Sequence, residues 1–244
     1  MSSSLRDPCV VIIGGSSGIG FCVAECASAA GAEIFIGSSG AENVERALKQ
    51  LGVGAEGAVI NVRDEASVAG FFDEVGAFAH LVYTAGDWDP KRGGGAIAEL
   101  DLEGAHATFT TRFWGALAAI KHAQGRIAAH GSITLTGGAI AHRPRKGAAL
   151  SAAMAGAIEH LTRALAVDLA PLRVNAVCPG YILTEVWNPI SEDRREEHLR
   201  KMTERQPLAR AGTPEEAAES YLYLMRGSFT TGQVLVVDGG MTLI

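Results

Sequence analysis

One glycine-rich turn near the start of the chain restricts its fold more than any other feature. An apolar run over residues 10–13 leads into Gly14, Gly18 and Gly20, and a segment of helix-forming residues follows and stops at Gly31. A strand, a glycine turn and a helix in this order form a phosphate cradle. Glycines let the backbone approach a pyrophosphate, and the helix N-terminus presents free N–H groups to the anion. The stretch therefore predicts a dinucleotide-binding protein.

The serines of the same turn allow a second interpretation. Residues 14–18 also fit the G-x-S-x-G elbow of α/β-hydrolases, in which the serine is a nucleophile between a strand and a helix. That elbow needs earlier strands to supply its oxyanion loop, and only nine residues precede Val10. We therefore expect Ser16 and Ser17 to contact the turn and a phosphate, not to act as nucleophiles.

The size and charge of the chain exclude several classes of function. Its 244 residues suffice for one α/β domain, which we expect to span residues 1–244. The formal net charge is −6 and the longest basic run is the segment 143–146, so we expect no nucleic-acid partner. No apolar segment suits a signal peptide or a membrane span, so we expect no membrane partner.

The cysteines indicate a reduced compartment. Cys9, Cys22, Cys26 and Cys178 lack the spacing of a disulfide framework. Cys22 and Cys26 lie one helical turn apart, but two further ligands are missing, so we expect small core residues and no metal site. These features predict a cytoplasmic protein.

Strand and helix patterns alternate along the whole chain. The expected strands cover residues 10–13, 33–36, 58–60, 80–83, 132–135, 173–177 and 233–237. The expected helices cover residues 21–30, 41–51, 65–75, 102–123, 148–170, 191–206 and 214–225. This alternation predicts an α/β fold, a Rossmann-like doubly wound parallel sheet of about seven strands with helices on both faces. The segment at about 184–212 is expected to be a variable substrate loop.

The residues after the second expected strand bear on cofactor choice. In such folds the ligand lies at the carboxyl ends of the strands, where NAD enzymes usually offer a carboxylate to the ribose. This chain offers Ser38 and Ser39 there, between two glycines and with no carboxylate. Two hydroxyls can bind a 2′-phosphate, so the sequence favours NADP(H) over NAD(H), although no arginine stands immediately beside them.

The strand-end segments, in their order and spacing, are similar to those of short-chain dehydrogenases/reductases, and the resemblance covers nearly the whole chain. Residues 61–62 (Asn-Val) resemble the Asp-Val pair at the adenine, and residues 84–86 (Thr-Ala-Gly) resemble an Asn-Ala-Gly turn. Residues 179–184 match the Pro-Gly-x-Ile-x-Thr segment that holds the nicotinamide amide and the pyrophosphate. The resemblance implies a cofactor site formed by Gly14, Ser16, Ser17, Gly18, Ile19, Gly20, Ser38, Ser39, Asn61, Val62, Ala85, Gly86, Pro179, Gly180, Ile182 and Thr184.

The catalytic positions depart from this family. Its active members use a Tyr-x-x-x-Lys pair as the acid–base group, with a Ser that orients the carbonyl and an Asn that supports a water relay. Here the Tyr position falls on Ser151 and the Lys position on Ala155, while Gly138 replaces the Ser and Arg112 the Asn. No Tyr or Lys lies between Gly147 and Ala170. An aliphatic hydroxyl is a much weaker acid than a phenol, so the usual carbonyl mechanism is not expected to carry over.

A first functional hypothesis is hydride transfer that needs no phenolic acid. An iminium acceptor already carries positive charge, so hydride addition neutralises it without a proton, and an oriented pocket supplies rate. Arg112, on an otherwise small and apolar helix, is a candidate active-site residue against the alternative of a buried ion pair. Other candidate polar groups are Ser151, His142, Arg143, Arg145, Lys146 and Asp87, with a solvated loop as the alternative for the basic cluster.

Two further hypotheses remain open. The chain could be a non-redox isomerase or cyclase, in which NADP forms one wall of the pocket, Arg112 stabilises negative charge and Trp88 or Trp187 shapes an apolar site. For Trp114, packing is the expected role. Alternatively, it could be an inactive NADP-binding or scaffold protein. The family resemblance also implies a small-molecule substrate and a homodimer or homotetramer, formed through the helices near 102–123 and 148–170.

Overall fold

The computed structural model describes residues 9–86, 95–188 and 190–244, and these residues share one parallel sheet. Its strand order is β3-β2-β1-β4-β5-β6-β7, and every neighbouring pair runs parallel. The strands are β1 (Cys9–Ile13), β2 (Glu33–Ser38), β3 (Ala55–Val59), β4 (Phe78–Tyr83), β5 (Ile127–Thr136), β6 (Arg173–Pro179) and β7 (Val234–Val237). The strand order reverses beside β1, which places a crevice at its carboxyl end.

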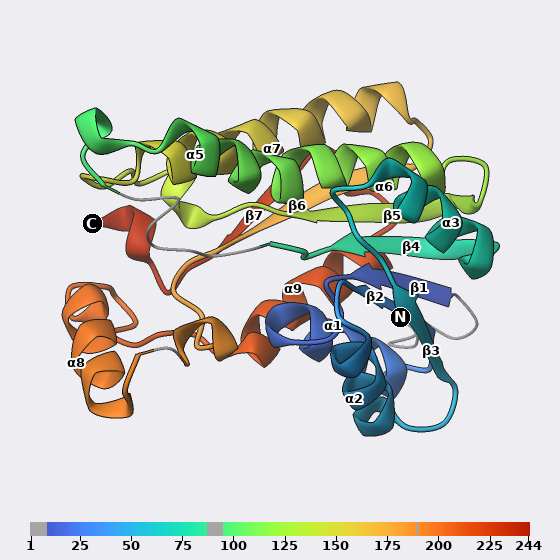
Figure 1. Cartoon of the computed structure of the whole chain (residues 1–244), viewed down its shortest axis with the longest axis horizontal. Helices are drawn as coiled ribbons and strands as arrows, with labels where there is room; N and C mark the ends of the chain where they lie inside the picture. The colour runs from blue at the N-terminus through green and yellow to red at the C-terminus, as the bar shows by residue number, and fades with distance from the viewer. Residues whose placement is uncertain (1–8, 87–94, 189) are drawn as a thin grey trace.

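Helices cover both faces of the sheet (Figure 1). On one face lie α1 (Gly18–Ala29), α2 (Ala41–Leu51) and α9 (Pro214–Arg226), and on the other lie α3 (Glu65–Val75), α5 (Leu102–Phe109), α6 (Gly115–Ala123) and α7 (Ala149–Asp168). Helix α8 (Glu192–Thr203) stands apart from both layers, beyond the carboxyl ends of the strands. The predicted doubly wound α/β fold is confirmed.

Each strand alternates its side chains between two apolar cores. Val11 and Ile13 of β1 point into a core shared with α3, α6 and α7, and Val10 and Ile12 into one shared with α1, α2 and α9. All four side chains are fully buried. Successive residues of a strand face opposite sides of the sheet, so a strand covered on both faces is a continuous apolar run.

Some element bounds differ from the sequence prediction. Strand β3 covers Ala55–Val59, three residues earlier than its expected start. Its first residues form no apolar run, but their backbone pairs with β2. Strand β5 extends back to Ile127, through polar and small residues. The expected helix over 102–123 is divided by a π-helical turn, Thr110–Trp114, which separates α5 from α6. The predicted helix start at Pro214 is confirmed, with a capping box between Thr213 and Glu216.

Among the described residues, no helix combines the length and apolar character needed to cross a membrane.

Candidate active site

A cleft of about 1430 Å³ opens at the carboxyl ends of the strands. Every residue expected from the sequence to bind the cofactor lines it, from the turn after β1 to the segment after β6. Arg112, Ser151 and Ala155 line the same cleft, and so do Arg143, Arg145 and Lys146 of the loop between β5 and α7. The structure thus brings the expected cofactor residues and most of the candidate catalytic residues into one cavity.

The turn between β1 and α1 lies against the end of β4 with no space for side chains. A Cβ added to Gly14, whose φ is +91°, would lie 2.6 Å from the backbone nitrogen of Ala85. One added to Gly20 would lie 2.3 Å from the carbonyl oxygen of Gly14. The Thr84 hydroxyl donates to the carbonyls of Ile13, at 3.1 Å, and Gly14, at 3.2 Å. These contacts hold the turn and the α1 N-terminus open toward the cleft, where backbone N–H groups suit an anion.

The end of β2 provides hydroxyl groups at the same cavity. The Ser16 hydroxyl donates to that of Ser38 at 2.8 Å, while Ser39 is exposed. Arg63, which follows β3, also lines the cleft, and its Nε donates to the Thr111 hydroxyl at 2.9 Å. Sequence reasoning missed Arg63 because the chain brings it from the next strand along the sheet, not from the turn that holds the serines.

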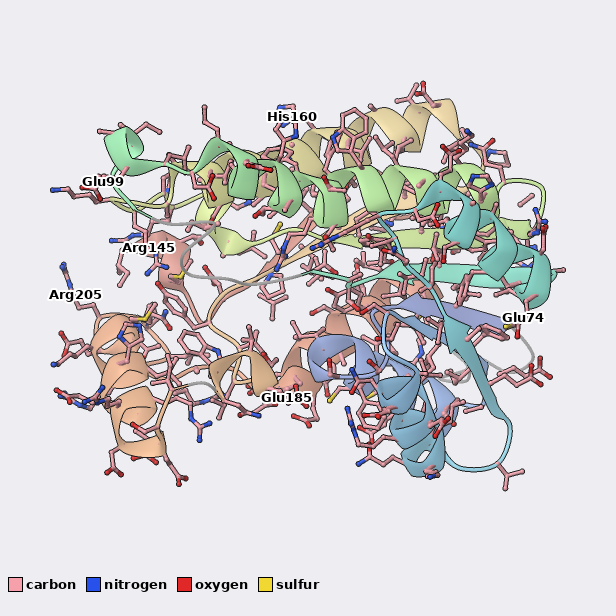
Figure 2. The ribbon with its side chains drawn as sticks, in the orientation of Figure 1. Glu74, Glu99, Arg145, His160, Glu185 and Arg205 are labelled. Carbon is pink, nitrogen blue, oxygen red and sulfur yellow. The ribbon has the colours of Figure 1, made fainter. Side chains whose placement is uncertain are left out.

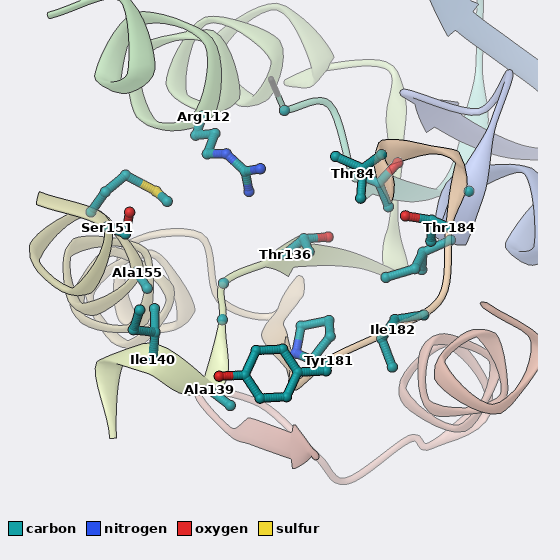
Figure 3. Close-up of a pocket in the computed structure, with 18 of the residues that line it drawn as sticks. Thr84, Arg112, Thr136, Ala139, Ile140, Ser151, Ala155, Tyr181, Ile182 and Thr184 are labelled. Carbon is teal, nitrogen blue, oxygen red and sulfur yellow. The ribbon is translucent and has the colours of Figure 1, made fainter. Parts of the chain in front are cut away.

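Arg112 reaches the cleft from the π-helical turn. The Tyr83 hydroxyl, at the end of β4, donates to the Thr111 carbonyl at 2.5 Å, so that carbonyl is engaged outside the helix. A Cβ on Gly86 would lie 2.6 Å from Arg112 Cζ, so the guanidinium lies directly against this glycine. In Figure 3 the guanidinium points into the cavity on the side that holds Ser151. Single π-helical turns are frequent at functional sites.

The other substituted catalytic positions face the cavity without a titrating side chain. Ser151 and Ala155 lie on successive turns of α7, and Gly138 lies opposite them at the end of β5. A Cβ on Gly138 would lie 3.7 Å from Ile140 Cγ2 and 3.9 Å from Ala155 Cβ, which is ordinary contact. The space for a larger side chain is therefore present at Gly138.

Tyr181 is a phenol that sequence reasoning overlooked. Of the four tyrosines in the chain, it is the one that lines the cleft, and its ring lies in the cavity in Figure 3. It occupies the unspecified position of the Pro-Gly-x-Ile segment, so the motif gave no reason to select it. Tyr221 is fully buried beneath the sheet, where burial raises the pKa of its hydroxyl and Thr136 Oγ1 lies 2.7 Å away.

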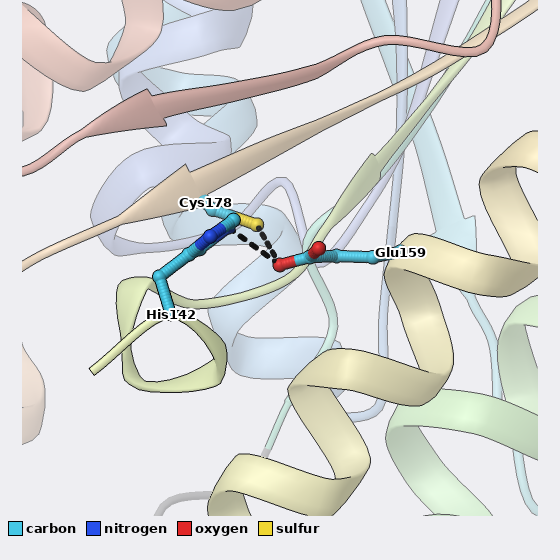
Figure 4. A group of neighbouring side chains, drawn as sticks. All are labelled: His142, Glu159 and Cys178. Atoms are coloured by element: carbon cyan, nitrogen blue, oxygen red, sulfur yellow. Dashed lines mark hydrogen bonds and ion pairs between the residues drawn. The ribbon is translucent and has the colours of Figure 1, made fainter. Parts of the chain in front are cut away.

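His142, a candidate catalytic residue in the sequence, is not among the described residues that line the cleft. Its Nε2 lies 2.8 Å from Glu159 Oε1, and the Cys178 thiol donates to the same oxygen at 3.6 Å (Figure 4). Burial, and then the Glu159 carboxylate, raise the pKa of the Cys178 thiol to about 12. His142 therefore joins the loop after β5 to α7 and points away from the cavity.

The cluster of His142, Glu159 and Cys178 has side chains of the types that bind metal ions. Their ligand atoms all lie within 4.8 Å of one another. Hydrogen bonding within the cluster already engages these atoms. The expected absence of a metal stays a prediction.

Trp187 lies where the cyclase hypothesis expects it, at the cleft, whereas Trp114 differs from its expected role. Trp187 is 6% exposed and lines the cleft, with its Nε1 donating to the Ile182 carbonyl at 2.9 Å. The packing role expected for Trp114 is wrong, because this side chain is 58% exposed. The π-helical turn orients Arg112 inward and leaves Trp114 on the outer surface. Asp87 and Trp88 lie outside the described residues.

The fold and the cradle together define a dinucleotide-binding α/β protein. A family model described as enoyl-(acyl carrier protein) reductase matches residues 14–242. A curated short-chain dehydrogenase/reductase of Stachybotrys chlorohalonatus, ATR9, is 35% identical, covering 98% of this chain and 99% of the relative. The chain belongs to the short-chain dehydrogenase/reductase family.

Solved structures support the same assignment. The MalC reductase/Diels-Alderase of Malbranchea aurantiaca superposes with a TM-score of 0.92 and 32% identity, covering 100% of both chains. A small-chain dehydrogenase solved in complex with NADPH superposes with a TM-score of 0.82 and 32% identity, covering 98% of this chain and 100% of that one.

The buried Glu159 generates a prediction about stability. Replacing it by alanine leaves the Cys178 thiol without its acceptor and the His142 ring without its partner. We expect Glu159→Ala to lower the free energy of unfolding by about 1–3 kcal/mol, measured by urea denaturation. Glu196→Ala, on the exposed face of α8, is the matched control and should change it by less than about 0.5 kcal/mol. Equal stability of the two variants would show that the cluster contributes nothing.

Proposed function

We propose that this chain is an NADP(H)-dependent oxidoreductase that reduces an activated acceptor, such as an imine, an iminium or a conjugated carbonyl. The observation that carries the proposal is the combination in one cleft of a glycine-lined cofactor cradle with the Arg112 guanidinium, where α7 presents Ser151 and Ala155 instead of a phenol and an amine. An NADPH complex among the related structures supports the choice of cofactor.

The residues present fit a dinucleotide. Gly14, Gly18 and Gly20 leave the backbone bare for a pyrophosphate, and the N-cap residue Ser17 has no side-chain capping hydrogen bond, so its hydroxyl is not engaged there. Ser38 and Ser39 would hold the 2′-phosphate, and residues 179–184 would hold the nicotinamide amide. When bound, NADPH supplies the hydride for a reduction.

Arg112 would act on the acceptor by charge stabilisation. A guanidinium is always protonated and offers donors in a fixed fork, so it stabilises a developing oxyanion but cannot supply the proton. Any proton must come from another group, and the described lining offers the Tyr181 hydroxyl, the His198 ring and the Lys201 ammonium group beside solvent. This division of roles differs from the usual site, where one phenol does both.

The same charge restricts the acceptor. A guanidinium near a cationic iminium raises the energy of the bound cation, because like charges repel strongly in a partly buried site. Acceptors that gain negative charge during reduction, such as an enone that becomes an enolate, gain stability from Arg112. An iminium fits if it carries its own anionic group close to the guanidinium.

A non-redox cyclisation is the second candidate. MalC, which has the same fold and is 32% identical over its whole length, is described as both a reductase and a Diels-Alderase. Arg112 would then polarise a carbonyl of the reacting π-system, and Trp187 with Ile140 would supply the apolar walls. This reaction would leave the cofactor unchanged.

We also propose that the chain forms a homodimer or homotetramer through α5, α6 and α7. Large apolar side chains are exposed on these helices, with Leu102 73%, Trp114 58% and Val167 77% exposed. Contacts between copies would remove this apolar area from water.

The serines at the end of β2 predict the cofactor preference. We expect calorimetry to give a lower Kd for NADP than for NAD. Ser39→Asp should weaken NADP binding by about tenfold or more, since a carboxylate repels the 2′-phosphate, and should leave NAD binding nearly unchanged. Ser228→Asp, outside the cleft, should alter neither. Tighter NAD than NADP binding by the unchanged protein would contradict the assignment.

Arg112 predicts a separation between binding and rate. Arg112→Ala should lower kcat/KM with an activated acceptor by about a hundredfold or more, as loss of an oxyanion donor does. NADPH affinity, measured by fluorescence titration, should change little. Arg112→Lys should recover part of the rate, and Arg194→Ala, outside the cleft, should retain it. Unchanged kcat/KM in Arg112→Ala would mean that the guanidinium is structural.

The exposed helices predict the oligomeric state. Light scattering after gel filtration should give twice or four times the chain mass of 25.4 kDa. Trp114→Glu should shift the population toward monomer, because a charge is costly in an apolar interface. Phe229→Glu, an exposed aromatic outside these helices, is the control and should leave the mass unchanged. A monomer in the unchanged protein would contradict the proposal.

A further inference from the structure

We propose that the outer part of the cleft binds an anionic group of the substrate, a carboxylate or a phosphate. This inference rests on the proposed function, since it concerns the substrate of the same site. Basic side chains line that region from two separate elements. Arg143, Arg145 and Lys146 come from the loop between β5 and α7, while Lys201 comes from α8 and Arg205 from the turn that follows it.

This concentration of charge is not a consequence of composition. The whole chain holds 27 acidic and 21 basic residues, for a formal net charge of −6. Within the described lining of the cleft, Glu185 is the only acidic side chain. Segment 87–94 contributes two acidic and two basic residues to the sequence, so its formal charge is zero. An acidic protein thus surrounds one cavity with positive charge, and such a cavity attracts and orients anions.

The basic residues lie apart from the parts of the cleft assigned to the cofactor. Figure 2 places Arg145 and Arg205 near α8 and the C-terminal segment, away from α1 and α2. Helix α1 begins at the cradle, and α2 follows the serines at the end of β2. Glu185 lies at the cradle end, since its Oε2 would be 3.5 Å from a Cβ on Gly18. The phosphates of a dinucleotide therefore do not account for the charge around the outer opening.

The individual side chains have different degrees of engagement. Arg143 donates to the Met241 carbonyl at 3.0 Å, and Lys201 pairs with Glu197 at 2.5 Å. None of the ion pairs between described residues involves Arg145, Lys146 or Arg205. All three are exposed, so their charged groups are accessible to an anion. An arginine fork also matches the geometry of a carboxylate or phosphate.

The described lining of the cleft also has an apolar part. It includes Ile140, Met154, Trp187 and Met202. A substrate that satisfies both regions has an apolar body with the reacting group at Arg112 and an anionic end at Arg145 and Arg205. Neutral molecules of the same shape would leave the outer charges solvated and gain nothing from them.

The test compares ligand pairs in which one member carries the anionic group and the other does not. Calorimetry with the full chain saturated with NADP would measure binding of 4-oxo-4-phenylbut-2-enoate, a conjugated enone with a carboxylate, and of its methyl ester. Phenyl phosphate against phenol, and inorganic phosphate alone, would separate recognition of an organic phosphate from that of a free anion. We expect the charged member of at least one pair to bind about tenfold tighter or more, because hydrogen bonds to charged groups are worth more than neutral ones.

Two double variants test whether the basic side chains of the outer cleft cause the charge preference. Arg145→Ala with Arg205→Ala should bring the charged-to-neutral affinity ratio close to one, with the neutral ligand unaffected. Arg194→Ala with Arg226→Ala removes the same charge from outside the cleft and should preserve the ratio. Equal binding within both pairs, no binding by any charged ligand, or a ratio that survives Arg145→Ala with Arg205→Ala would overturn the proposal. Because binding is measured without turnover, a protein that shows the charge preference but never oxidises NADPH would refute the reductase function alone.

Discussion

The close approach of the β1–α1 turn to the end of β4 is the constraint on which the rest of the site depends. Gly14 and Gly20 lie so near Thr84 and Ala85 that a single methyl group would force the two strand ends apart. The Thr84 hydroxyl joins the same two strands through the carbonyls of Ile13 and Gly14. Because the strand order reverses between β1 and the central strand β4, this contact fixes where the crevice opens and which strand ends surround it.

Arg112 owes its position to the same strand end. The hydroxyl of Tyr83, one residue before Thr84, donates to the Thr111 carbonyl, and the helix forms a π turn there. Gly86 then leaves the space that the guanidinium fills. A phenol–lysine pair on α7 both stabilises charge and delivers a proton, whereas a guanidinium on the facing helix does only the first. We infer that the family scaffold is retained while the demand on the acceptor changes, from a simple carbonyl to one that is already activated.

The fold and the cofactor end could be predicted from the sequence because local signals determine them. Apolar runs followed by glycine or by Pro179-Gly180 mark strand ends, and parallel strands bring those ends together whatever lies between. The substrate end depends on relations that no local pattern contains. Arg63 enters the cleft from the loop after β3, and Tyr181 enters it from the loop after β6. His142 points elsewhere because Glu159, buried on α7, pairs with its ring.

The basic residues of the outer cleft were visible in the sequence only as the short run at 143–146, for which a solvated loop was the favoured explanation. Its partner residues, Lys201 at the end of α8 and Arg205 just after it, lie more than fifty residues further along the chain. Because α8 lies beyond the strand ends, these residues and the run at 143–146 line the same cleft. Exposed charges of this kind carry no burial signal, so their meaning depends on the cavity they surround.

The central claim is that the cleft still transfers a hydride although the usual acid is absent. The most direct measurement uses NADPH deuterated at C4 of the nicotinamide, on the transferable face, with a conjugated carboxylate enone as acceptor and mass spectrometry of the product. Hydride transfer predicts a product that carries one deuterium, with one NADPH oxidised for each product molecule formed. A product formed without the label, with the cofactor still reduced, would contradict it and favour cyclisation in a pocket that only holds the nucleotide.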